Sequence, residues 1–305
     1  MRKGIYYIKN NFIFCFGLLL LIFLFFMAFF GQYLPFIDED LEKIDFVMTE
    51  GSLSVAPFEP SKEHLLGTDR EGRDMLSLIV MGAKETLLIV ILVTLIRYLL
   101  AIPLSYLAHK KFLGANVFLK GLNQFFSYVP TIIMVVLLAT LPPFLFSDTR
   151  PYLLILIIAF VEVGRAAEMI KVDLDEIASK EFIQSGLAVG ANSFTLLKSY
   201  YLPFLYGKVS VYFISDISKV MFLLGQLGLI GIFISQDLIQ VEIGVFEMRN
   251  DSISWPMLLM NSTLDIRGPI WIPFWSAFAM TLTIFTFNLI AHGIQNLPKK
   301  KDSYI

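Results

Sequence analysis

Long apolar runs are the feature that most constrains how this chain can fold. A helix needs about 20 apolar residues to cross the roughly 30 Å hydrocarbon core of a membrane. The first such run, Phe12–Phe30, contains no charged residue. Only 16% of the 305 residues are charged, whereas about 25% are charged in a typical soluble domain. The sequence therefore predicts an all-α integral membrane protein.

Six runs are expected to span the membrane, the first of them as an uncleaved helix. They cover residues 12–30, 86–108, 123–145, 152–169, 209–234 and 270–290. Lysine and arginine gather at the ends of the chain, at Arg2, Lys3 and Lys9 and again at Lys299, Lys300 and Lys301. Because basic segments stay on the inner face of a membrane, both termini are predicted to be cytoplasmic. Trp255 and Trp271 fall where an aromatic belt is expected.

The chain divides into an N-terminal part and a core. Residues 1–85 hold the first span, an acidic extracytoplasmic segment and a short interfacial helix that begins near Met75, with Asp74 as its N-cap. Residues 86–305 hold the other five spans and a cytoplasmic loop at 171–208. In the fifth span, glycines at positions 225, 228 and 231 predict close helix packing. The acidic segment 31–63 is interpreted as solvated loop rather than as a binding surface.

A polar, glycine-punctuated stretch occupies most of that cytoplasmic loop. It reads EFIQSGLAVGANSFTLLKSYYLP over residues 181–203. Gly190 permits a positive φ or a close backbone approach that a side chain would block. The pair Leu202-Pro203 is expected to end the second half. The stretch therefore predicts a short helix, a turn and a second helix, which together dock on a soluble partner.

Several ionisable residues fall inside the predicted spans. They are Arg97, Glu162, Arg165, Glu168, Asp216 and Lys219. Such residues are costly in hydrocarbon and usually face another helix or a water-filled cavity. Glu162 and Arg165 are three residues apart, as are Asp216 and Lys219, so the members of each pair share a helix face. Two interpretations stay open: the charges line a translocation path, or they form internal ion pairs.

Motifs for catalysis or metal binding are absent from the sequence. The phosphate-binding pattern G-x-x-x-x-G-K-[ST] does not occur, nor do G-x-S-x-G and H-E-x-x-H. The histidines at positions 64, 109 and 292 are far apart, and the single cysteine excludes an intramolecular disulfide. The chain is therefore expected to be no enzyme, with no catalytic residue and no bound metal.

Two motifs resemble the permeases of ABC importers. Residues 64–74, HLLGTDREGRD, are similar to the signature His-Pro-Leu-Gly-Thr-Asp-x-x-Gly-Arg-Asp of the dipeptide, oligopeptide and nickel branch. The matching residues are Gly67, Thr68, Asp69, Gly72, Arg73 and Asp74. Residues 181–203 resemble the family's ATPase-coupling EAA loop at Gly190, Leu202 and Pro203, and Ala191 follows the glycine. Gln184, Ser185 and Gly186 replace the usual Glu-Ala-Ala, and Glu181 lies one helical turn earlier.

This resemblance implies the type I ABC importer permease fold and a translocation pore subunit for oligopeptides or dipeptides. It also implies several partners: a second homologous permease, two ATP-binding subunits that hold ATP and Mg, an extracytoplasmic solute-binding protein, the peptide and membrane lipid, but no nucleic acid. No cofactor is expected on this chain itself. The alternatives are a nickel or metal-chelate permease of the same family, a peptide-sensing membrane module and a proton-driven carrier.

Overall fold

The computed structural model describes residues 11–44, 46–49, 52–147, 149–242, 245–250 and 252–296. Its long helices are α2 (Phe12–Phe30), α3 (Met75–His109), α11 (Leu202–Ile230) and α13 (Trp271–Asn296). The shorter helices are α4 (Ala115–Ser127), α5 (Thr131–Ala139), α6 (Pro142–Leu145), α7 (Arg150–Val161), α8 (Val163–Ala178), α9 (Glu181–Ala188), α10 (Ser193–Thr195) and α12 (Ser262–Asp265). Short 3-10 or π turns form η1 (Gly31–Tyr33), η2 (Phe112–Gly114), η3 (Leu196–Tyr201) and η4 (Met257–Leu259).

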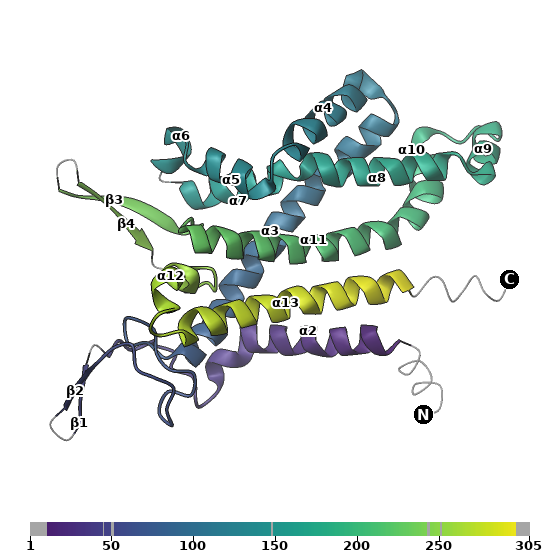
Figure 1. Ribbon diagram of the computed structural model, residues 1–305. Helices are drawn as coiled ribbons and strands as arrows, with labels where there is room; N and C mark the ends of the chain where they lie inside the picture. The colour runs from purple at the N-terminus through teal and green to yellow at the C-terminus, as the bar shows by residue number, and fades with distance from the viewer. Residues whose placement is uncertain are drawn as a thin grey trace, which may run out of the picture.

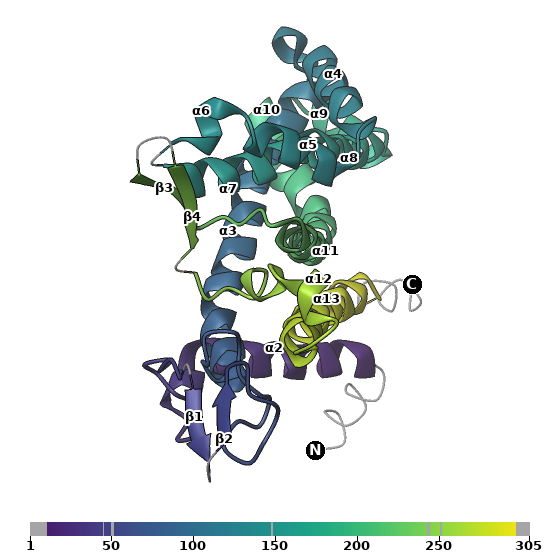
Figure 2. The same ribbon diagram turned by 60° about the vertical axis from the view of Figure 1, so that its left-hand side comes forward.

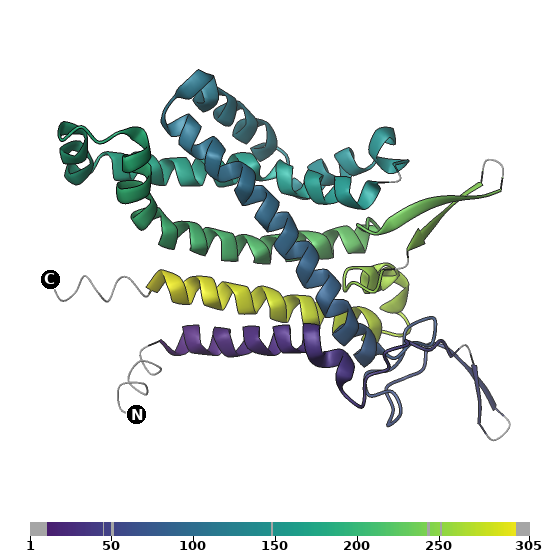
Figure 3. The same cartoon turned by 180° about the vertical axis from the view of Figure 1, so that it is seen from behind.

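The helices stack side by side, and α3 crosses the stack. Helices α2, α13, α11 and α8 follow one another as neighbours (Figure 1). From behind, α3 runs diagonally across them and contacts each one (Figure 3). Helix α2 begins and α13 ends at the end of the stack that carries α9 and α10, while two β-hairpins lie at the opposite end. The long helices thus connect two distinct ends of the molecule.

Each hairpin consists of two antiparallel strands. Strands β1 (Phe46–Thr49) and β2 (Ser52–Val55) form the first, and β3 (Gln236–Glu242) and β4 (Val245–Asn250) form the second. The first hairpin lies in the segment that the sequence assigns to the outer face. The second lies between α11 and η4, in the stretch between the fifth and sixth predicted spans.

Four helices of the described residues are long and apolar enough to cross a membrane. These are 12–33, 75–109, 193–230 and 271–296, and a fifth span results if the bent pair α4–α5 is counted as one. The prediction of a helical membrane protein is confirmed at this level. The basic termini on which the predicted orientation depends, residues 2–9 and 299–301, lie outside the described residues.

Helix α3 corrects one predicted boundary. The expected N-cap is present, since the Asp74 carboxylate accepts a hydrogen bond of 2.8 Å from the backbone N–H of Ser77. The short interfacial helix, however, does not stand alone, because α3 continues from Met75 to His109 without a break. The expected division between residues 85 and 86 thus falls inside one helix.

The third and fourth predicted spans are not single helices. At Pro130 the chain bends by 92° between α4 and α5, because proline lacks a backbone N–H and clashes with the preceding turn. Residues 152–169 are divided between α7 and α8, which meet at Glu162 with φ −100° and ψ 2°. Both predicted spans are therefore interrupted at a particular residue.

Two glycines in α11 let other segments approach closely, and a third ends the helix. A Cβ on Gly228 would lie 2.5 Å from the carbonyl oxygen of Pro256, and one on Gly225 would lie 3.0 Å from the methyl group of Met280. Gly231 adopts φ +81° and terminates α11 at Ile230, four residues before the predicted end. Close packing is thus confirmed for the first two glycines only.

The core lies where α3 crosses α7 and α11. Val90 and Met221 are completely buried there, among neighbours from α5 and α7. Trp255 is also part of this core and is only 2% exposed; its indole N–H donates to the carbonyl of Ile79 at 2.8 Å. The prediction that Trp255 belongs to an aromatic belt is therefore wrong, because a hydrogen-bond partner for the indole is available inside the helix stack.

We expect Gly228→Ala to lower the free energy of unfolding by about 1–3 kcal/mol, since the added methyl group must displace a backbone carbonyl. Thermal unfolding in detergent measures the effect. The matched control is Gly207→Ala in the same helix, where a Cβ meets no atom within 4 Å. Equal melting temperatures for the two variants would contradict this packing.

Candidate functional site

The segment from α9 through η3 projects from the helix stack. It connects the end of α8 to the start of α11 and lies beyond the other helices at its end of the stack (Figures 1 and 3). The opposite end, where the two β-hairpins stand apart from each other, comes forward in Figure 2. Gly190 makes the turn within the projecting segment with φ +86°, and a Cβ there would meet no atom within 4 Å. The expected positive φ is therefore present. No close backbone approach to this glycine is made among the residues that the structure describes, so this side of Gly190 is open to another molecule.

The second half of the segment does not end at Leu202-Pro203 as predicted. Residues 196–201 form the π turn η3, and α11 begins directly after it. Pro203 lies directly after this π turn, and the locally widened turn accommodates a residue that has no backbone N–H to donate. The projecting segment is consequently joined to a long membrane helix by a wide turn, and such turns are frequent at functional positions.

The residues that replace Glu-Ala-Ala have different surroundings. A Cβ on Gly186 would lie 2.9 Å from the ring of Tyr200, so the glycine lets α9 pack on η3. Glu181 and Gln184 are exposed, and the hydroxyl of Ser185 donates to the Glu181 carbonyl at 3.1 Å. The departure at Gly186 thus has a local packing reason, while the other two polar side chains face outward.

Apolar side chains are exposed on this segment. Val189 is 89% exposed and Phe194 is 71% exposed, and Phe182 stacks on the ring of Phe204 at 4.9 Å between centroids. Ile183, by contrast, is buried and anchors α9. Clustered exposed apolar groups mark sites where another protein binds.

An ion-pair network ties α8 to α11 beside the segment. The Lys208 ammonium contacts the buried Asp173 carboxylate at 2.7 Å and that of Glu176 at 3.1 Å. The Tyr212 hydroxyl donates to Asp173 at 2.9 Å. The hydrogen bond from Lys208 lowers the pKa of Glu176 below its usual value, so this carboxylate stays ionised and paired at neutral pH.

A second network joins α3 and η3 to α8. Nδ1 of His109 lies 2.6 Å from the Asp175 carboxylate, and Nε2 lies 3.3 Å from the Tyr201 hydroxyl. Lys171 contacts the same carboxylate at 3.1 Å. Partial burial works against ionisation of Asp175, but the hydrogen bonds from His109 and Lys171 outweigh it and lower its pKa. Sequence reasoning missed both networks; the spacing of Lys171 and Asp175 by four residues was the one local signal.

One of the two predicted ion pairs, Asp216 with Lys219, forms inside the helix stack. The Asp216 carboxylate contacts Lys219 at 2.7 Å, as the spacing of three residues predicts. It also contacts Arg97 of α3 at 3.4 Å and accepts a hydrogen bond from the Tyr98 hydroxyl at 3.2 Å. Arg97 is 2% exposed and donates to the carbonyl of Ile158 at 3.1 Å. Asp216 therefore joins α3 and α11.

The other predicted pair forms at the junction of α7 and α8. Glu162 and Arg165 lie 3.2 Å apart, and the hydroxyl of Thr131 donates to Glu162. Together with Arg97 and Lys219 they line a cavity of about 280 Å³. Glu168 does not line this cavity and contacts Lys171 at 3.6 Å instead. The structure thus brings five of the six predicted charges to one place.

The signature at residues 67–74 forms a compact turn that begins α3. Asp69 is buried and accepts hydrogen bonds from the Arg73 guanidinium at 2.6 and 2.8 Å and from the Arg73 N–H at 2.8 Å. Gly67 and Gly72 adopt φ of +80° and +75°, and Thr68 accepts a hydrogen bond at its carbonyl from Trp271. These contacts assign the motif a role in holding α3 against α13.

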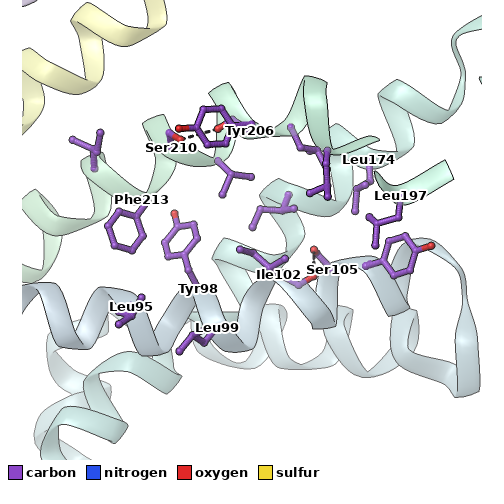
Figure 4. A pocket seen from close by; sticks show the side chains of 16 residues that line it. Leu95, Tyr98, Leu99, Ile102, Ser105, Leu174, Leu197, Tyr206, Ser210 and Phe213 are labelled. Atoms are coloured by element: carbon purple, nitrogen blue, oxygen red, sulfur yellow. Dashed lines mark hydrogen bonds between the residues drawn. The ribbon is translucent and has the colours of Figure 1, made fainter. Parts of the chain in front are cut away.

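A second cavity of about 630 Å³ lies between α3, α8 and α11, next to η3 (Figure 4). The rings of Tyr98 and Phe213 pack edge to face on one side, at 5.4 Å between centroids. Its remaining walls are mostly aliphatic side chains such as Leu95, Ile102 and Leu174. The cavity is thus suited to apolar groups and leaves space beside the base of the projecting segment.

Comparison with known proteins identifies the class. No family model matches the chain. It is 25% identical over 291 residues, 95% of its own length and 82% of the relative's, to the dipeptide transport system permease protein DppC of Bacillus subtilis. It is 24% identical over 241 residues, 78% and 71% of the two lengths, to the oligopeptide transport system permease protein OppC of Haemophilus influenzae. The glutathione transport system permease protein GsiD of Pectobacterium atrosepticum is 22% identical over 279 residues, 90% and 83%.

The chain is therefore similar over most of its length to permease proteins of peptide and glutathione transport systems. The resemblance to the oligopeptide and dipeptide branch of ABC permeases, which the two motifs predict, is confirmed.

We expect Lys208→Met to loosen the projecting segment, because the buried Asp173 carboxylate loses its cation, at a cost of about 1–3 kcal/mol. Hydrogen exchange of the amides in residues 181–201 should become faster. Lys198→Met is the control, since Lys198 is exposed in the same segment. Unchanged amide exchange rates of residues 181–201 in Lys208→Met would show that the ion pairs of Lys208 do not hold the projecting segment.

Proposed function

We propose that this chain is the transmembrane permease subunit of an ATP-driven importer that moves peptides across the cytoplasmic membrane. The observation that carries the proposal is the similarity to a dipeptide permease over 95% of the chain. The segment from α9 through η3 supports it further, because it projects from the membrane helices and exposes apolar side chains. In this proposal ATP and Mg bind to separate ATPase subunits that receive the segment.

The proposed orientation places that segment in the cytoplasm. Lys180 lies between α8 and α9, and Lys198 lies in η3. Lys110 and Lys111 follow the end of α3, where the Lys110 ammonium lies 5.6 Å from the ring centroid of Tyr201 in η3. Basic residues favour the cytoplasmic face. The start of α2 and the end of α13 lie at the end of the stack that carries this segment. With α4–α5 and α7–α8 as two interrupted spans, the chain crosses the membrane six times and both termini are cytoplasmic.

Movement of the ATPase subunits would reach the membrane helices by two routes. The first is covalent, through η3 into α11. The second is the contact of Lys208 with Asp173 and Glu176, which links α11 to α8. Both helices contribute to the cavity lined by Arg97, Glu162, Arg165 and Lys219. Closure of the ATPase subunits therefore shifts the population between outward-open and inward-open arrangements of these helices. A second, homologous permease forms the other wall of the translocation path. A solute-binding protein delivers the peptide to it.

The experiment is a detergent pull-down of this chain from its native membrane, with assay of the eluate for ATP hydrolysis. ATPase subunits should be recovered with the intact chain. Gly190→Val should reduce that recovery at least about tenfold, because a β-branched residue is strained at φ +86°. Gly190→Asn is the matched control, since asparagine tolerates this conformation, and it should retain more of the ATPase.

Thermal unfolding of the variants separates loss of docking from loss of folding, because a Cβ at position 190 meets no atom of the described residues within 4 Å. Recovery of the partner permease without any ATPase from the intact chain would overturn the importer assignment. A peptide-sensing membrane module would then be favoured. Uptake of a metal chelate but not of peptides by the intact complex would instead favour the metal-chelate permease.

A further inference from the structure

We propose that the cavity lined by Arg97, Arg165 and Lys219 binds the terminal carboxylate of the peptide during its passage. This inference rests on the proposed function and assigns to these residues one step of it. The cavity has a volume of about 280 Å³ and lies among α3, α5, α8 and α11. Its size suits the end of a peptide rather than a whole peptide, since sites that enclose a complete small ligand begin at about 300 Å³.

The charges around this cavity do not balance. The positive groups are Arg97, Arg165 and Lys219, and the negative groups that contact them are Glu162 and Asp216. Three cations therefore face two carboxylates, which leaves one positive charge in excess. An uncompensated charge at membrane depth is costly. A carboxylate that enters the cavity removes this cost, and a neutral ligand does not.

The arrangement of the ion pairs shows which cations are open to a ligand. Arg97 is buried, and its guanidinium is also occupied by the carbonyls of Ile158 and Ala159. Asp216 alone serves both Arg97 and Lys219. The side chains of Lys219 and Arg165 are about half exposed, at 50% and 49%, and both reach the cavity wall. These two side chains are the ones that contact the ligand, and Arg165 offers the fork geometry that holds a carboxylate in two hydrogen bonds.

Two interruptions of helical structure meet at the same cavity. One is the 92° bend at Pro130 between α4 and α5, and the other is the junction of α7 and α8 at Glu162. Irregular backbone at membrane depth occurs where it is buried in protein or lines a water-filled cavity. Two such breaks from separate parts of the chain, beside an excess cation, indicate a polar binding site rather than a packing defect.

The other walls of the cavity offer polar and apolar contacts to the backbone and side chain of the terminal residue. Gln226 adds an amide, and Ile132, Phe222 and Leu223 add apolar surface. A side chain of variable kind can therefore lie on the apolar part while the carboxylate contacts the cations. The site selects for the common terminal group of peptides and is tolerant toward the side chain.

The test measures binding to the complex purified with its permease and ATPase partners in nanodiscs, without solute-binding protein. The probes are dialanine, dialanine amide and acetate, and the readout is the ligand-dependent shift of thermal unfolding. Dialanine should bind at least about tenfold more tightly than its amide, which lacks the negative charge. Acetate should bind more weakly than dialanine, because it lacks contacts with the remaining walls.

Lys219→Gln should reduce the preference for dialanine over the amide to less than about twofold, since the charges around the cavity are then equal. Lys219→Arg keeps the charge and should keep the preference. If Lys219→Gln does not assemble, Arg165→Gln provides the same comparison, with ATPase activity of the complex as the check on assembly. A preference that survives both neutral variants, or equal binding of dialanine and its amide by the intact complex, overturns the proposal.

Uptake into proteoliposomes, with solute-binding protein and ATP, separates the two levels of inference. ATP-driven uptake of peptides by a complex without the carboxylate preference rejects the binding site and leaves the importer function in place. No uptake of any peptide rejects the function itself. Uptake of dialanine that falls at least about tenfold in Lys219→Gln but not in Lys219→Arg supports both the importer function and the carboxylate site.

Discussion

A helix that breaks inside a membrane exposes carbonyl groups that no lipid can satisfy, and the arrangement of this protein depends on how those groups find partners. Helix α7 ends at Val161, and the last carbonyls of a helix lack the N–H partners that a following turn would supply. Arg97 reaches across from α3 and donates to the carbonyls of Ile158 and Ala159. The same guanidinium contacts Asp216 of α11. One side chain therefore satisfies the break and joins three helices around it.

This interaction explains why the charges are compatible with membrane depth. A cation at the C-terminal end of a helix is favoured by the helix dipole, and the contact with Asp216 adds a charge of opposite sign. Replacement of Arg97 by an apolar residue would remove the donors that it supplies to the carbonyls of Ile158 and Ala159, and a carbonyl without a partner in hydrocarbon costs several kcal/mol. These ion pairs thus have a structural role whether or not they contact a ligand. The proposed carboxylate site depends on the one positive charge by which Arg97, Arg165 and Lys219 exceed Glu162 and Asp216.

The projecting segment depends on a comparable arrangement at the end of the stack. Ile183 anchors α9 by burial, and the contact of Lys208 with Asp173 fixes α11 to α8 where the segment leaves them. Gly190 turns the chain beyond this base with φ +86°, and the space that a Cβ would occupy there is open. The segment is therefore firmly held at its base and open at its tip, which is the combination required of a part that transmits movement from one protein to another.

The sequence by itself determined the class of fold, the first helix and the two motifs, because these depend on local properties. Apolar composition alone makes Phe12–Phe30 a membrane helix, and Asp74 caps α3 through residues next to it in the chain. The spacing of three residues likewise predicted the pairs at Glu162–Arg165 and Asp216–Lys219.

Only the tertiary structure decided where helices break, where they continue and which distant groups meet. Hydropathy averages over about a turn or more of helix, so it does not distinguish a straight span from one bent by 92° at Pro130. The pair Leu202-Pro203 does not end a helix here, because the π turn η3 before it continues directly into α11. The contacts of Arg97 with Asp216 and of Lys208 with Asp173 join residues 119 and 35 positions apart. Such pairs depend on how the helices cross, and crossing is a property of packing that no single segment of the sequence contains.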